Sequence, residues 1–180
     1  MVEIFLAEAT AWLAQQKIGF REVFLGCSVV VALLQFHLAS KEAARSNQRK
    51  REEYALTYSL TRNDRHVEAR QALAKYFGAT TPDSEPVPMN VVLELYESED
   101  PKIISYVNLI LNHWENMALA ICRGVADEDT AFEMVGRRFL NTVRQYRSYI
   151  EHVSKESPSS FKYLNWLEKR WQRRKSATRR

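Results

Sequence analysis

Three polar side chains at helical spacing are the first candidates for chemistry. Asn108, Asn112 and Glu115 stand at positions i, i+4 and i+7 of a stretch without Gly or Pro, so on a helix they lie on one flank. Together they could converge on a ligand. Because a half-buried carboxylate needs a partner, we favour a structural polar network that holds two helices together. The basic partners available in the following helix are Arg137, Arg138 and Arg144.

The second candidate pair is Arg147 and His152, in the sequence RSYIEH. This pair resembles the motif of HEPN-type helical endoribonucleases, and the resemblance implies RNA cleavage near a dimer seam through the 2′-hydroxyl of the RNA. Those motifs place an amide, acid or imidazole after the arginine, whereas Ser148 follows here, and positions five apart on a helix diverge by about 140°. Arg62 and His66 are better oriented, yet a solvated turn explains them equally well. A soluble dimeric ribonuclease therefore stays an alternative.

Other reaction classes lack their motifs. The four histidines are scattered, without a His-x3-His or Cys-x2-Cys pattern, and the five glycines form no phosphate-binding loop. No nucleophile elbow occurs. Cys27 and Cys122 lie far apart in apolar stretches, where small thiols are expected to be buried. We therefore expect no metal site and no cofactor, and we favour a role without catalysis.

One segment near the N-terminus raises the question of a membrane. Val23 to Ala39 contains seventeen residues without a formal charge, and at about 1.5 Å per residue it covers roughly 25 Å of a hydrocarbon core of about 30 Å. The segment is apolar on all sides, which favours a transmembrane helix over the alternative, a buried core helix of a soluble protein. The apolar side chains of the expected span are Val23, Phe24, Leu25, Val29, Val30, Val31, Leu33, Leu34, Phe36 and Leu38.

Basic residues flank this segment unevenly. Five follow within a dozen residues, against Lys17 and Arg21 before it, so the positive-inside rule places the C-terminal bulk in the cytoplasm. The last twelve residues carry seven basic and no acidic side chains, without which the net charge of +4 would be −3. Such groups attract phosphate or stay solvated. The candidate contacts to lipid or nucleic acid are Lys41, Arg45, Arg49, Lys50, Arg51, Arg173, Arg174, Lys175, Arg179 and Arg180.

The remaining sequence predicts an all-α fold. Five Gly and five Pro are too few to separate the strands of a sandwich or barrel. We expect an amphipathic helix over 1–18, a transmembrane helix and basic stalk over 20–60, a helical bundle over 61–172 with a loop at 78–88, and a basic tail over 173–180.

Cap signals divide the bundle into three or four antiparallel helices. Asp127 predicts the start of a long helix that we expect to reach Ile150. Gly136 falls on the inner face of that helix, where a missing side chain would allow a neighbouring helix to approach closely. Ser157–Pro158 repeats a cap followed by proline and predicts the start of the last helix.

Three runs resemble a bacterial family of uncharacterised proteins, a domain of unknown function. They are LNHWENMALAICRGVADEDT (Leu111 to Thr130), YIEH and SPSSFKYLNWLEKRW. In that family one N-terminal hydrophobic helix precedes a basic stalk and a cytosolic helical domain. The resemblance thus implies a membrane anchor and a helical fold, and it implies no activity. The matching positions are Asn112, Trp114, Glu115, Gly124, Asp127, Glu128 and Phe161 to Trp171.

These patterns favour a single-pass protein of the bacterial inner membrane with its helical domain in the cytoplasm. We expect this domain to act as an interaction or scaffold module. Its expected partners are anionic membrane lipid and an unidentified protein, and a homo-oligomer is a further alternative. Nucleic-acid binding through the basic tail is disfavoured but stays open as an alternative beside the ribonuclease.

Overall fold

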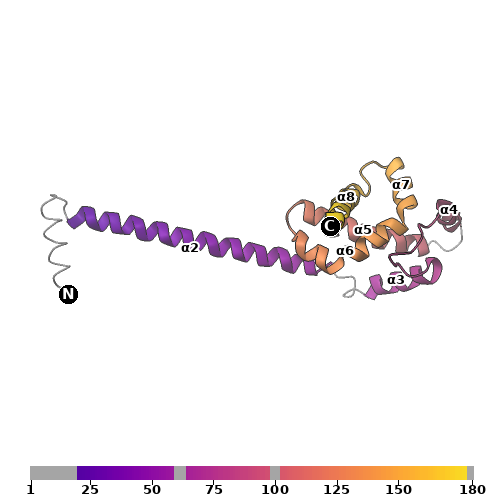
Figure 1. The fold of residues 1–180 in the computed structure, drawn as a ribbon, viewed down its shortest axis with the longest axis horizontal. Helices are drawn as coiled ribbons and strands as arrows, with labels where there is room; N and C mark the ends of the chain where they lie inside the picture. Colours follow the sequence, from indigo (N-terminus) through magenta and orange to yellow (C-terminus); the bar gives the residue numbers. More distant parts are fainter. Residues whose placement is uncertain (1–19, 59–63, 98–101, 178–180) are drawn as a thin grey trace. The chain divides into compact units, whose positions relative to one another are not determined.

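The computed structural model describes residues 20–58, 64–97 and 102–177. Every regular element in these ranges is a helix, and none of them contains a strand, which confirms the all-α expectation (Figure 1). The amphipathic helix expected over 1–18 lies outside the described residues. The helices are α2 (Phe20–Leu56), α3 (Asp64–Phe77), α4 (Met89–Glu97), α5 (Lys102–Cys122), α6 (Glu128–Gln145), α7 (Arg147–Glu156) and α8 (Lys162–Ala177).

The chain divides into two compact units, Met1–Asn47 and Gln48–Arg180. In the first unit the described residues belong to α2, which is one uninterrupted helix of 37 residues (Figure 1). The hydroxyl of Ser28 donates to the carbonyl oxygen of Leu25 at 2.8 Å, and that of Ser40 donates to His37 at 3.3 Å. Because these hydroxyls bond the helix's own backbone, they need no outside partner.

The second unit, called the body below, is organised around α5. This helix contacts α3, α4, α6 and α8, so it occupies the centre of the core. Apolar residues recur along it at helical spacing, and this stripe is buried along the whole helix, since a helix surrounded by others buries each side chain of such a stripe. The buried side chains of that stripe are Ile103, Val107, Ile110, Leu111, Trp114, Met117, Ala118 and Ile121.

A chain of aromatic rings joins three helices of the body. The rings of Trp114 in α5 and Phe139 in α6 meet edge to face, with centroids 5.8 Å apart. Phe139 contacts Trp171 of α8 at 5.0 Å, and Trp171 contacts Phe132 of α6 at 5.2 Å. Edge-to-face aromatic pairs contribute about 0.5–1.5 kcal/mol each beyond their buried area, so this chain fixes how α5, α6 and α8 pack.

Gly136 serves this packing in a way that differs from the expectation. A side chain at this buried glycine would meet the ring of Phe132 at 2.9 Å, one turn earlier in the same helix. The missing side chain therefore makes room for the ring of Phe132 in α6 itself. The atoms nearest to Gly136 belong to this ring, and not to another helix as expected.

The helix expected from Asp127 to Ile150 is interrupted at Tyr146, which is a correction to the sequence prediction. Asp127 does cap α6, because its side chain accepts from the N–H of Thr130. At the other end, the carbonyl oxygen of Gln145 accepts from the N–H of Val87 at 2.8 Å. This carbonyl is thus used by the loop before α4, and α7 begins as a separate helix.

The last helix also begins later than Ser157–Pro158 predicts. Ser157 caps the C-terminal end of α7, a turn follows, and α8 starts at Lys162. Phe161, immediately before α8, has a positive φ of 55°, a backbone conformation that is uncommon for a residue with a bulky side chain. Phe161 is nevertheless buried in the core, so the packing of its ring holds the turn in place.

Candidate functional site

The apolar segment of α2 has no buried face. One helix near the N-terminus, Phe24–Leu56, is long and apolar enough by length and composition to cross a membrane. The large apolar side chains of the expected span are between 52% and 75% exposed, from Val31 to Phe36. The surroundings of Val23 lie outside the described side chains. A helix segment that is apolar all round and has these side chains exposed among the described residues calls for an apolar environment.

Basic side chains follow the apolar segment on one side of the same helix. Lys41, Arg45 and Arg49 recur at every fourth position and are exposed, so they share one face of α2. Lys50 is exposed as well, whereas Arg51 is partly buried and its Nε atom has no hydrogen-bond partner among the described residues.

The end of α2 belongs to the body and is tied to the start of α6 through Asp127. The N–H of Asp127 donates to the carbonyl oxygen of Arg51 at 3.0 Å, and the side chain of Gln48 donates to its carboxylate at 3.0 Å. The N–H and hydroxyl of Thr130 donate to the same carboxylate, each at 2.9 Å. These donors lower the pKa of Asp127, the Thr130 N–H first and Gln48 second, because they favour the ionised carboxylate.

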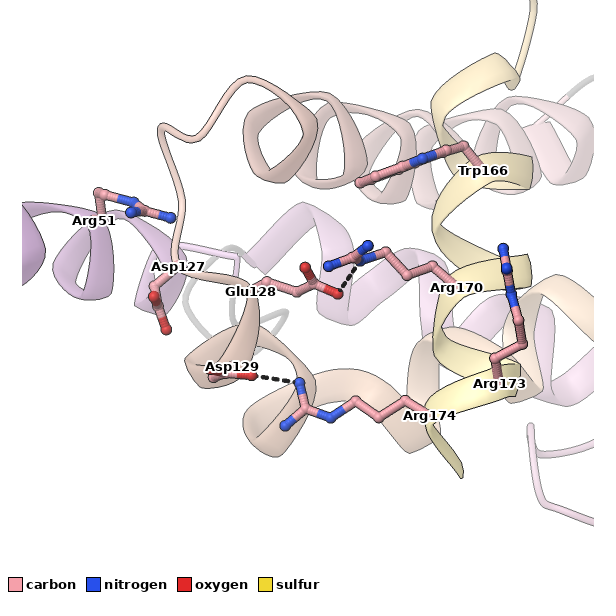
Figure 2. A pocket seen from close by; sticks show the side chains of 8 residues that line it. All are labelled: Arg51, Asp127, Glu128, Asp129, Trp166, Arg170, Arg173 and Arg174. Atoms are coloured by element: carbon pink, nitrogen blue, oxygen red, sulfur yellow. Dashed lines mark hydrogen bonds and ion pairs between the residues drawn. The ribbon is translucent and has the colours of Figure 1, made fainter. Parts of the chain in front are cut away.

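A groove of about 560 Å³ lies beside this junction, between the start of α6 and α8 (Figure 2). Two ion pairs cross it. Arg170 donates from Nε to Glu128 at 2.6 Å, and Arg174 donates to Asp129 at 2.6 Å, as the dashed lines in Figure 2 show. We call it the charged groove, and its lining residues are Arg51, Asp127, Glu128, Asp129, Trp166, Arg170, Arg173 and Arg174.

Most of the charge in the groove is already neutralised. The hydrogen bond from Arg170 to Glu128 raises the pKa of that guanidinium, and the Nε–H of Trp171 donates to the same carboxylate at 3.3 Å. The guanidinium of Arg174 also stacks 4.2 Å above the ring of Phe132. Residues 173–177 of the predicted basic tail thus belong to helix α8, which these contacts hold against α6. An acidic ligand would have to compete with two ion pairs here.

The expected basic contacts thus fall into different settings. Arg174 is held by Asp129, whereas Arg173 and Lys175 are exposed near the end of α8, where Nε of Arg173 donates to the carbonyl oxygen of Lys169 at 3.2 Å. Arg179 and Arg180 lie outside the described residues. The sequence contained a signal for the pairs Arg170–Glu128 and Arg174–Asp129. The two acids are adjacent after Asp127, and the two arginines are four residues apart, which places them on one helix face.

Arg147 and His152 are not brought together. Arg147 binds Glu168 of α8 and donates to the side-chain oxygen of Asn165 at 3.2 Å. His152 instead lies 3.3 Å from Glu156, one turn later on the exposed side of α7. Each side chain has a different partner. This arrangement gives Arg147 a role in docking α7 onto α8.

The three polar residues on one flank of α5 do not form one network among themselves. Asn108 accepts a hydrogen bond from the hydroxyl of Tyr149 at 2.7 Å, and Asn112 is exposed. Glu115 accepts from the backbone N–H groups of Tyr163 and Leu164, at 3.1 Å and 2.6 Å. The expected arginine partner is therefore replaced by the first turn of α8, whose N–H groups have no partner within the helix.

An aromatic and histidine cluster lies where α5 meets α3 and the turn after α2. The rings of His66 and His113 are 4.8 Å apart, and Nε2 of His113 lies 3.0 Å from the carbonyl oxygen of Tyr58. Burial lowers the pKa of His113 to about 4, because the charged form would lose its hydration. The pKa of His66 is also lowered, first by burial and then by neighbouring arginines.

No group of three or more His, Cys, Asp or Glu among the described residues could hold a metal ion. The two cysteines were expected to be buried, and both are exposed. Cys27 lies in the apolar part of α2, and Cys122 is the last residue of α5. Ile121, the residue before Cys122, is buried, whereas Cys122 is exposed at the end of the helix.

Residues 23–171 match the model of a family described as a domain of unknown function (DUF4760). The match begins at the first residue of the apolar segment and ends in α8. No curated protein and no solved structure matches the chain.

Proposed function

We propose that this chain, which belongs to the DUF4760 family of domains of unknown function, is a single-pass protein of a bacterial inner membrane. Residues 23–39 form the anchor, and the body acts in the cytoplasm as an interaction or scaffold module. One observation carries this proposal: the large apolar side chains from Phe24 to Leu38 are all more than half exposed.

Insertion of this segment is energetically reasonable. Nine large apolar side chains of α2 between 24 and 38 are exposed, and each contributes about 0.3–0.6 kcal/mol near the centre of a membrane helix. Their sum, about 3–5 kcal/mol, favours insertion, and the polar side chains of Ser28, Gln35 and His37 act against it. The cost of Ser28 is lowered because its hydroxyl already bonds the helix backbone. A soluble protein with the same helix would leave this surface in water, which costs free energy.

The basic side chains after the segment support the orientation and the lipid contact. Lys41, Arg45 and Arg49 form an exposed face beginning within three residues of Leu38. Each lysine or arginine near an anionic leaflet contributes about 1 kcal/mol. Such a face belongs on the cytoplasmic side of the membrane, which would place the body there.

The interaction role is supported by what the body offers. Its core is closed by its own helices, and its charged groove is crossed by ion pairs rather than lined by an acid and a base at catalytic distance. A domain of this kind presents surfaces rather than chemistry. In the cytoplasm, these surfaces would meet a protein partner close to the membrane.

Alkaline carbonate extraction of membranes tests the anchor with the full chain. We expect wild-type protein to stay in the pellet and the double variant Val30→Asp, Leu33→Asp to be released, because each Asp at the centre of a span costs about 2.5–3.5 kcal/mol. The matched control is Leu93→Asp, at an exposed leucine of α4, which should stay in the pellet. Release of the wild-type chain contradicts the anchor, and so does retention of the double variant.

The native cysteine of the body tests the orientation. Cys122 is exposed, so a membrane-impermeant maleimide should label the Cys27→Ser variant in lysed spheroplasts and leave it unlabelled in intact ones. Equal labelling of intact spheroplasts would place the body outside. That result would refute both the orientation and a cytoplasmic interaction module.

A further inference from the structure

A second, smaller pocket lies in the body away from the charged groove. It has a volume of about 190 Å³ and lies where α3, α5 and α6 meet the residues after α3. We call it the two-arginine pocket. Its lining residues are Arg70, Leu73, Ala74, Ala79, Thr80, Ile110, Arg138, Thr142 and Tyr146.

Two positive charges face this pocket and no carboxylate lines it. Arg70 comes from α3 and is partly buried, and Arg138 comes from α6 and is exposed. The described ion pairs include neither arginine. Nε of Arg70 is buried and has no hydrogen-bond partner among the described residues. A buried donor without an acceptor is costly, so the site is incomplete as a purely structural arrangement.

The electrostatics of Arg70 agree with this geometry. Burial lowers the pKa of its guanidinium, and the nearby charge of Arg138 lowers it further. The two cations thus repel each other across a partly enclosed space. An anion placed between the two guanidiniums would attract both of them and would supply an acceptor for Nε of Arg70.

The other lining groups indicate the rest of the ligand. The hydroxyl of Thr142 donates to the carbonyl oxygen of Arg138 at 2.9 Å, and the hydroxyl of Thr80 donates to Gln145 at 2.5 Å. Their protons are therefore engaged elsewhere, and the side-chain donors that remain are the two guanidiniums and the hydroxyl of Tyr146. Leu73 and Ile110 give the pocket an apolar wall, and both are buried.

We propose that the two-arginine pocket binds a small organic carboxylate, with the carboxylate held between Arg70 and Arg138 and a short apolar part against Leu73 and Ile110. The volume of about 190 Å³ corresponds to roughly six water molecules at about 30 Å³ each. This space suits an acid of a few carbon atoms and is too small to enclose a nucleotide. The site does not depend on the proposed membrane anchor.

The test uses the full chain in detergent micelles at constant ionic strength. Butyrate and benzoate serve as probes, butyramide as the uncharged match to butyrate, and inorganic phosphate as a carbon-free oxyanion. Thermal unfolding followed by tryptophan fluorescence reports binding, since Trp114 and Trp171 are fully buried in the body. We expect a saturable rise of Tm with at least one carboxylate and none with butyramide.

Three arginine variants make the test specific. Arg70→Gln and Arg138→Gln should each weaken carboxylate binding by about tenfold or more, because each removes a charge-assisted hydrogen bond. Arg137→Gln is the matched control, since this exposed neighbour on α6 does not line the pocket. If Arg70→Gln does not fold, Arg138→Gln decides, because its side chain is exposed.

Several results would overturn the proposal. A body that responds to neither carboxylate has no such site, and an equal response to butyramide would show binding without the arginines. Equal weakening by Arg137→Gln would indicate general screening of charge. Binding of phosphate alone would show an oxyanion site and would refute the organic carboxylate.

Discussion

Glu115 offers the sharpest test of how the body is held together. Its carboxylate accepts from the N–H groups of Tyr163 and Leu164 at 3.1 Å and 2.6 Å. Both donors belong to the first turn of α8, where N–H groups lack partners within the helix and a negative charge is favoured by the helix dipole. Glu115→Ala would therefore remove both acceptors at once and leave the start of α8 unsatisfied.

The magnitude follows from these two bonds. A hydrogen bond to a charged group contributes about 1.5–3 kcal/mol, and the two bonds share one partly exposed carboxylate, so we expect Glu115→Ala to lower the free energy of unfolding by about 2–4 kcal/mol. Glu115→Gln keeps one acceptor oxygen and loses the charge. It should therefore cost about half as much.

Urea unfolding of the full chain in detergent micelles, followed by tryptophan fluorescence, measures this effect. Trp171 of α8 is fully buried, so loosening of α8 should change its emission. The matched control is Asn112→Ala, on the same flank of α5 but exposed, which should change stability by less than about 0.5 kcal/mol. If Glu115→Ala costs no more than Asn112→Ala, the carboxylate does not hold α8 and the reasoning is wrong.

Two further predictions concern other parts of the body. Burial lowers the pKa of His113 to about 4, so between pH 6.5 and 4 the unfolded chain binds a proton that the folded body does not, and the free energy of unfolding should fall by at most about 3 kcal/mol as the pH drops. Urea midpoints across this range should slope less in His113→Gln, and an unchanged slope would assign the effect to other groups. Gln145 is buried and accepts from the hydroxyl of Thr80, so Gln145→Ala should cost about 1–3 kcal/mol and expose the loop at 78–88 to limited proteolysis. Equal cleavage rates in wild type and variant would show that the loop is held by other contacts.

The features that the sequence predicted well are those decided within one helix. The stripe on α5 repeats with helical spacing, and a helix at the centre of a core buries every member of such a stripe. Asp127 caps α6 with bonds to a residue only three positions away.

The features that the sequence missed depend on partners far along the chain. The interruption at Tyr146 follows from a bond between Gln145 and Val87, which are separated by the whole of α5. The partner of Glu115 lies 48 or 49 residues later, and no spacing rule on α5 points to it. Local propensity alone favours one long helix at Tyr146, and tertiary contacts override it.

Ser157–Pro158 shows how a correct local signal can receive the wrong role. A serine followed by proline is typical of a helix start, and the same residues also fit the end of a helix, because proline cannot continue it. Here Ser157 caps α7 through its own N–H, which donates to Val153. The N–H groups of α8 are satisfied instead by Glu115, so the start of α8 needs no local cap.

The same division explains which functional residues could be found from the sequence. The proposed anchor is a continuous run of apolar residues, so it is visible in the sequence before any folding is considered. The two-arginine pocket is built by α3, α5 and α6, and Arg70 and Arg138 are 68 positions apart. In the sequence each resembles an ordinary solvated arginine. In the fold both line a pocket that contains no carboxylate. What distinguishes the pair is this missing counter-charge, a property of three-dimensional packing that spacing along one helix does not encode.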